Sequence, residues 1–244
     1  MGADDGYSSL VQLLPYMEES GLYDRLLEVA DEFAKPPNHP DFNEVDGSLW
    51  DTHISTLICP SYTGKLEAPG AYLPASRPQV SNYFGVVAAC SERDEQILAD
   101  VNPKTGGAVV TLRSSSTGLP LTEIADGSAH TMIFTESCRE QWSVWFSGVS
   151  ASTVAFPPDE VTAADIESGS FDALPVGLQY GDDSKFFWSR ETNPQRRGPS
   201  SHHAGEVVMT SFVDGHVRPI NPGVGPRVYF AMAARGDGMK IDGD

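Results

Sequence analysis

Two adjacent histidines near the C-terminus, His202 and His203, precede Asp214 by about ten residues, and these side chains could carry out chemistry together. Two imidazoles and a carboxylate can bind a metal ion, and a histidine with an aspartate and Ser200 or Ser201 can form a hydrolytic triad. Both interpretations require the side chains to converge in space. A histidine that hydrogen-bonds a neighbouring loop explains the same pattern. The sequence contains no HExxH, nucleophile-elbow or paired-carboxylate motif, which favours this structural role and a protein that is not an enzyme.

Carboxylates in two other places could hold a cation. Asp237, Asp242 and Asp244 lie in a glycine-containing tail, and calcium binds oxygen-rich loops of this kind. The EF-hand spacing is absent, so a solvated acidic tail is favoured and calcium, the one cofactor considered, is the alternative. Asp126 also offers oxygens, but a turn in which it accepts the N–H two residues on and Gly127 takes a positive φ is favoured. Glu136 is then expected to close this turn by a hydrogen bond across the sheet.

Aromatic residues gather between positions 142 and 188. Aromatic rings beside polar turns can stack on sugar rings or anchor a partner protein, although core packing is their ordinary role. Trp188 is the strongest candidate for a surface residue, because Lys185 and Arg190 flank it. Trp188, Tyr180 and Trp145 are therefore the candidates for binding a glycan or a small solute.

The overall charge limits the class of partner. The 34 acidic and 16 basic residues give a formal net charge of −18, which repels nucleic acids and anionic lipids. The three cysteines, Cys59, Cys90 and Cys138, lack the spacing of a zinc site, and both one disulfide and an all-thiol state remain open. No apolar run approaches the roughly 18–20 residues that a membrane span needs.

Helical spacing of apolar residues appears twice near the N-terminus. Ser8 and Ser9 are candidate N-caps for a first helix, which Pro15 must interrupt. A second helix is predicted from Leu22 to Phe33, after a break at Ser20-Gly21. A closing helix is predicted over 228–234, before Gly236.

Strand-like runs predict an antiparallel sheet, because no helices alternate with them. Asp214-Gly215 between two such runs predicts a two-residue type I′ hairpin. The segment 147–201 is predicted to be a loop-rich excursion. The fold class is α+β, with 1–244 as a single domain. The predicted strands span 83–89, 108–112, 131–135, 142–146, 206–213 and 216–220.

Four separated stretches resemble one family, a large set of paralogous planctomycete-type proteins of unknown function. Its members have a prepilin-type N-terminal helix and a C-terminal motif of His, nine residues and Asp-Gly; the family is also described as solute-binding-protein-like. The matching stretches are Leu13–Glu18 with Gly21–Tyr23, Leu57–Ser61 with Ser81–Tyr83, Glu123–Thr131 closing at Glu136, and Ser200–Val217. The family-motif positions are Cys59, Pro60, Asp126, Gly127, Glu136, His203, Asp214 and Gly215.

Two features depart from the family pattern. Ten residues rather than nine separate His203 from Asp214, and a β-bulge in the strand before the hairpin would accommodate the extra one. The N-terminal apolar helix is absent, and we expect the complete gene to encode about 20 apolar residues upstream of Ser8.

The resemblance implies a pilin-like body that is exported to the periplasm or the cell surface. The expected role is a non-enzymatic subunit of a surface filament or a secretion-type pseudopilus, with other pilin-like subunits or envelope proteins as partners. The membrane would be reached only through the missing helix. An extracellular glycan- or solute-binding module is the alternative, and a metal-dependent hydrolase is a weaker one.

Overall fold

The computed structural model describes residues 6–30, 35, 37, 49–68, 77–89, 106–109, 118–138, 143–148, 151–155, 199–221, 224 and 226–238. The chain groups into two compact units. The first comprises Met1–Tyr83, Thr111–Gly118 and Cys138–Ser152, and the second comprises Phe84–Val110, Leu119–Ser137 and Thr153–Asp244. A single domain over 1–244 stays a prediction, and most of the predicted excursion over 147–201 lies outside the described residues.

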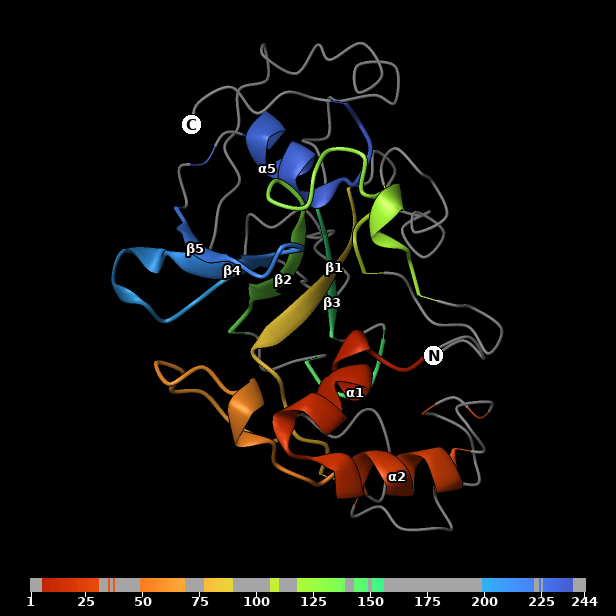
Figure 1. Cartoon of the computed structure of the whole chain (residues 1–244). Coiled ribbons are helices and arrows are strands. Elements are labelled where there is room, and N and C mark those ends of the chain that lie inside the picture. The colour runs from red at the N-terminus through yellow and green to blue at the C-terminus, as the bar shows by residue number, and fades with distance from the viewer. Residues whose placement is uncertain are drawn as a thin grey trace, which may run out of the picture. The chain divides into compact units, whose positions relative to one another are not determined.

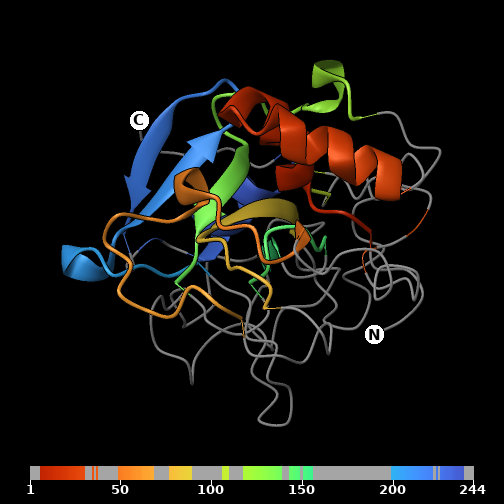
Figure 2. The same cartoon turned by 90° about the horizontal axis from the view of Figure 1, so that it is seen from below.

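Helices at the N-terminus of the first unit follow the predicted break at Pro15. Helix α1 (Ser9–Leu13) runs into a 3-10 turn, η1 (Leu14–Met17), in which Pro15 occupies the first turn. Proline is tolerated there because the first N–H groups of a helix have no intrahelical partner. Helix α2 (Ser20–Val29) follows (Figure 2). It buries Leu22 and Leu26. A further 3-10 turn, η3 (Ser55–Leu57), belongs to the same unit.

Two details of these helices differ from prediction. Ser8 stands at the N-cap of α1, but its hydroxyl donates to the backbone oxygen of Trp145 instead of capping the helix. The break before α2 lies at Glu18, whose φ is 64°, and Ser20 already belongs to the helix. Phe33, the predicted last apolar position, lies outside the described residues.

Aromatic side chains form the core of the first unit. Trp50 packs on Phe146 with ring centroids 4.1 Å apart, and Trp145 meets the edge of Phe146 at 5.5 Å. The predicted strand over 142–146 is wrong for its described part, because Val80–Val144 and Tyr7–Ser147 are only isolated bridges. Val144, Trp145 and Phe146 are all buried, whereas consecutive side chains of a strand point to opposite faces.

The second unit contains a five-stranded sheet with the order β3-β1-β2-β4-β5 (Figure 1). The pairs β2–β4 and β4–β5 are antiparallel, as predicted. Together with the helices, this sheet confirms the α+β fold class. The strands are β1 (Tyr83–Ala89), β2 (Met132–Glu136), β3 (Ser152–Ala155), β4 (Val208–Phe212) and β5 (Val217–Ile220).

Helix α5 (Pro226–Ala233) confirms the predicted closing helix and packs on this sheet. Tyr229, Phe230 and Met232 of the helix share one buried cluster with Met132 and Phe212 of the strands. Burial also raises the pKa of the Tyr229 hydroxyl. Two short 3-10 turns, η5 (Leu121–Glu123) and η7 (Ala204–Glu206), precede β2 and β4. Among the described residues, none of the helices has the length and apolarity to cross a bilayer.

The hairpin between β4 and β5 lies where the sequence predicts it, but its turn type differs. Gly215 N–H donates to Phe212 O, and Phe212 N–H donates to His216 O. Gly215 has a φ of 91°, whereas Asp214 does not have a positive φ. A type I′ turn needs positive φ at both central residues, so the loop is a three-residue one that ends in a left-handed glycine.

Two predictions about the strands were also wrong. Strand β4 pairs with β5 without interruption, so the expected bulge before the hairpin is not there. The irregularity lies on β2, between Met132 and Phe134. The described part of the predicted strand 108–112 is a bend, although Val109 N–H donates to Val86 O of β1.

Pro219 protects the outer side of the terminal strand β5. Because Phe212 and His216 form a hydrogen-bonded pair, alternation makes Met209–Pro219 a non-bonded pair, and the nitrogen of residue 219 faces away from β4. Proline removes the donor that an added strand would use.

We predict that Pro219→Val promotes association through β5, because it restores an outward N–H and a strand-forming side chain. Light scattering over a concentration series should show a rising mass for this variant and a constant mass for the wild type. Pro60→Val, at an exposed proline of the first unit, is the matched control. A constant mass for Pro219→Val would contradict this function of Pro219.

Candidate functional site

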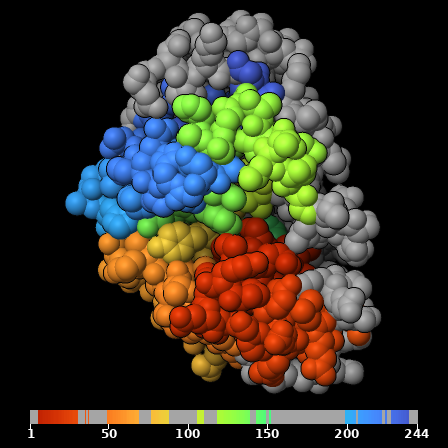
Figure 3. Space-filling model, viewed as in Figure 1, coloured from red at the N-terminus to blue at the C-terminus, as the bar shows by residue number. Residues whose placement is uncertain are grey.

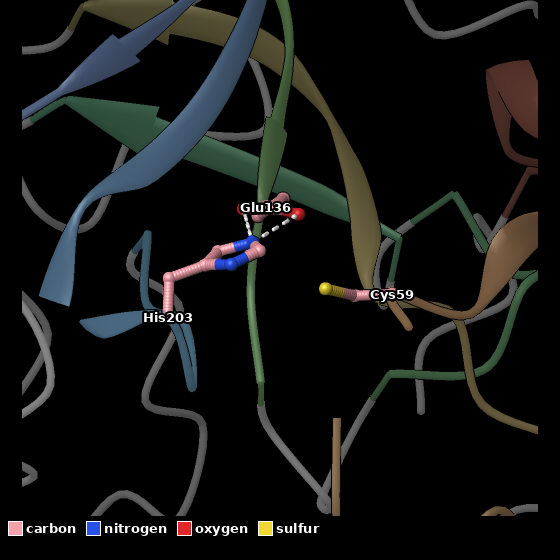
Figure 4. A group of neighbouring side chains, drawn as sticks. All are labelled: Cys59, Glu136 and His203. Carbon is pink, nitrogen blue, oxygen red and sulfur yellow. Dashed lines mark hydrogen bonds and ion pairs between the residues drawn. The ribbon is translucent and has the colours of Figure 1, made fainter. Parts of the chain in front are cut away.

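The predicted motif residues Glu136 and His203 form a direct pair in the second unit. Nε2 of His203 lies 3.2 Å from Oε1 and 3.1 Å from Oε2 of Glu136 (Figure 4). The Glu136 side chain is 4% exposed, whereas that of His203 is 26% exposed. An ionised carboxylate only accepts hydrogen bonds, so a hydrogen bond between an ionised Glu136 and this ring requires a proton on Nε2.

Glu136 also binds two backbone groups, and this makes it the centre of the site. Oε2 accepts the N–H of Met209 on β4 at 2.8 Å, and the backbone oxygen of Glu136 accepts the N–H of Ser200 at 3.1 Å. The predicted bond across the sheet is thus present, but it lies at the far end of β2 from the Asp126 turn that it was expected to close. One residue ties the end of β2 to β4, to His203 and to Ser200.

The loop that carries His203 is held by its own side chains. Ser201 Oγ donates to Val207 O at 2.6 Å and accepts the N–H of His203 at 3.3 Å. Gly205, with a φ of 76°, allows the tight turn that follows. These contacts place the His203 ring beside the carboxylate of Glu136.

Asp214 does not join His203; it pairs with His216 at the hairpin. Asp214 Oδ1 accepts the N–H of His216 at 3.1 Å and lies 2.6 Å from its Nδ1. The backbone hydrogen bond and then the side-chain hydrogen bond from His216 lower the pKa of Asp214 from its ordinary 3.8. The His216 ring also stacks on Phe212, with centroids 4.4 Å apart.

The alternative in which His203 and Asp214 converge is therefore contradicted by these contacts. Asp214 N–H donates to Ser128 O, before the start of β2, whereas His203 contacts Glu136 at its end. The four residue steps of β2 from Met132 to Glu136 alone span about 13 Å in an extended strand. Neither a triad nor a metal site that needs both side chains is formed.

Asp126 fixes the chain end that follows α5. Its Oδ2 accepts the N–H of Asp237 at 2.8 Å and its Oδ1 accepts that of Gly238 at 3.0 Å, while its own N–H donates to Arg235 O. The predicted turn is present, with Gly127 at a φ of 95°. The Asp126 carboxylate was expected to accept the N–H two residues on. It instead accepts N–H groups more than 100 residues away.

Asn82 plays the same role in the first unit, and sequence reasoning did not identify it as a site residue. Its N–H donates to Leu57 O at 2.8 Å, and its Oδ1 accepts the N–H of Cys59 at 3.0 Å. Cys59 is buried and Pro60 is exposed. The Asn82-Tyr83 dipeptide, already recognised as part of the resemblance, was the signal that could have identified this contact.

The remaining candidates do not form a shared site among the described residues. Trp145 is 0% exposed, so it is a core residue and cannot stack on a glycan. Trp188, Tyr180, Asp242 and Asp244 lie outside the described residues. Asp237 is half-buried and donates its N–H to Asp126. Calcium binding stays a prediction.

Chemically, these carboxylates act as acceptors for backbone N–H groups. Those of Asp126 and Glu136 accept N–H groups of distant segments, and that of Asp214 accepts the N–H of His216 in the same hairpin. Charged acceptors make such bonds strong, and a lost partner leaves a polar group unsatisfied.

Comparison with known proteins assigns the chain to a family. Residues 2–226 match the family model SBP_bac_10, described as a protein of unknown function (DUF1559). The chain therefore belongs to this family. Neither the curated proteins nor the solved structures contain a match.

We predict that Glu136→Ala lowers the free energy of unfolding by about 1–3 kcal/mol, because the N–H of Met209 loses its acceptor. Urea unfolding measures the change. Glu123→Ala removes an exposed carboxylate from η5 and serves as the control, with an expected change within about 0.5 kcal/mol. Equal stabilities of the two variants would mean that the Glu136 carboxylate does not stabilise the fold.

We predict that Asp126→Ala releases the segment after α5. Hydrogen exchange at the amides of Asp237 and Gly238 should become faster, because both lose their acceptor. Ser128→Ala tests the local turn instead and should leave these amides protected. Unchanged exchange in Asp126→Ala would mean that the carboxylate does not hold this segment.

Proposed function

We propose that this DUF1559 member is a non-enzymatic structural protein of the cell envelope, displayed outside the cytoplasm as a pilin-like subunit of a surface filament or a secretion-type assembly. Its α+β body presents surfaces to partners, and its motif residues maintain that body. Pilin-like subunits or other envelope proteins are the proposed partners.

The observation that carries this proposal is the use of the motif side chains inside the body. Asp126 joins the turn before β2 to the segment after α5, and Glu136 joins β2 to His203 and Met209. Asn82 joins Leu57 and Cys59. These residues connect distant segments of the chain, as a fold that serves as a platform requires.

Charge supports a location outside the cytoplasm. The net charge of −18 favours solubility in a medium where cations screen repulsion. The family model's solute-binding-type name points to the same side of the membrane.

A secreted binding module for glycans or solutes is the second candidate, and the family model's name is the observation that favours it. Trp188 and Tyr180 are the aromatic residues proposed for it. The burial of Trp145 removes the third.

We predict that the complete gene product, in cells of its native host, fractionates with the envelope and is cleaved by protease added to intact cells. An antibody against residues 6–238 detects the protein, and a cytoplasmic enzyme in the same samples serves as the lysis control. Shearing should release it in a sedimenting filament fraction.

Two results would contradict the proposal. Recovery with the cytoplasmic control would exclude an envelope role altogether. Recovery as a monomer in the medium would favour the secreted binding module over the filament subunit.

A further inference from the structure

One aromatic side chain of the first unit projects from the surface. Tyr16, in η1, is 85% exposed, the largest value among the large hydrophobic residues that the structure describes. The segment from α1 to α2 lies open on the face seen in Figure 3, in red. An aromatic ring so fully exposed gains nothing from core packing, and tyrosine is among the residues that contribute most at interfaces.

The exposure of Tyr16 does not come from a frayed chain end. The N–H groups of Glu18 and Glu19 both donate to Leu14 O, and Leu14 is 0% exposed. On the other side, Thr56 Oγ1 lies 3.8 Å from the Met17 sulfur. The backbone around Tyr16 is thus held, so a partner that binds here does not have to order a frayed segment.

The charges of the same segment define the partner. Glu18, two residues after Tyr16, is exposed, and Asp24 and Glu28 are exposed one helical turn apart on α2. Arg25 is the one basic residue between positions 16 and 28, against four acidic ones. An aromatic ring next to carboxylates suits a guanidinium group, which stacks on the ring and pairs with the acid.

We propose that Tyr16, with Glu18 and the exposed acidic residues of α2, is a docking surface for a basic, arginine-bearing segment of another protein. The proposal rests on the proposed function, because a subunit that works through contacts needs such a surface. A second copy of the chain is a poorer occupant, since two copies of net charge −18 repel each other.

A labelled peptide with four arginines in a glycine-serine background tests this surface by fluorescence anisotropy. The same peptide with citrulline removes the charge and keeps the shape. We expect the arginine peptide to bind and the citrulline peptide not to. Tyr16→Ala should weaken binding about two- to fivefold, as expected for an exposed cation–π contact. Tyr16→Phe keeps the ring and should bind like the wild type.

Leu121→Ala is the matched control, since Leu121 is 73% exposed on a 3-10 turn and should bind like the wild type. Thermal unfolding of Tyr16→Ala should match that of the wild type, which separates lost binding from lost folding. Equal affinity of Tyr16→Ala and wild type would overturn the proposal. So would self-association that Tyr16→Ala abolishes, because the occupant would then be a second copy. Either failure would leave the envelope fractionation result unaffected, so the docking surface and the proposed function can fail separately.

Discussion

The second unit depends on one buried carboxylate, that of Glu136. It lies at the end of β2, yet it bonds the backbone of β4, the ring of His203 and, through its own carbonyl, the backbone of Ser200. A buried carboxylate is costly unless its oxygens are satisfied, so these partners are a requirement as much as a benefit. The loop that carries His203 is therefore held in the position where its ring contacts the Glu136 carboxylate.

The same logic connects the other motif segments. Asp126 accepts two N–H groups after α5, and Asn82 holds Leu57 and Cys59. Each contact joins stretches that are far apart in sequence. Such a contact closes a long loop, and the chain entropy lost in closing it must be offset by tertiary contacts and not by local propensity.

Local patterns predicted much of the fold, because helices, strands and turns follow from nearby residues. The Pro15 break, β1 and α5 appear where periodicity and turn residues place them. The predicted strand 142–146 was wrong for its described part, since Val144, Trp145 and Phe146 are all buried. The partner of His203 could not be predicted, because a histidine beside Asp214 in sequence gives no information on which strand end its loop reaches. The predicted type of the hairpin turn was wrong because an Asp-Gly pair also suits a three-residue loop.

A double-mutant cycle between Glu136→Gln and His203→Gln tests the central contact most directly. Glutamine at position 136 keeps an acceptor for the N–H of Met209, so the cycle isolates the carboxylate–imidazole pair. We predict a coupling free energy of at least about 0.5 kcal/mol in urea unfolding at neutral pH. Additive effects of the two substitutions would contradict the account, because the pair would then contribute nothing to holding the loop on the sheet.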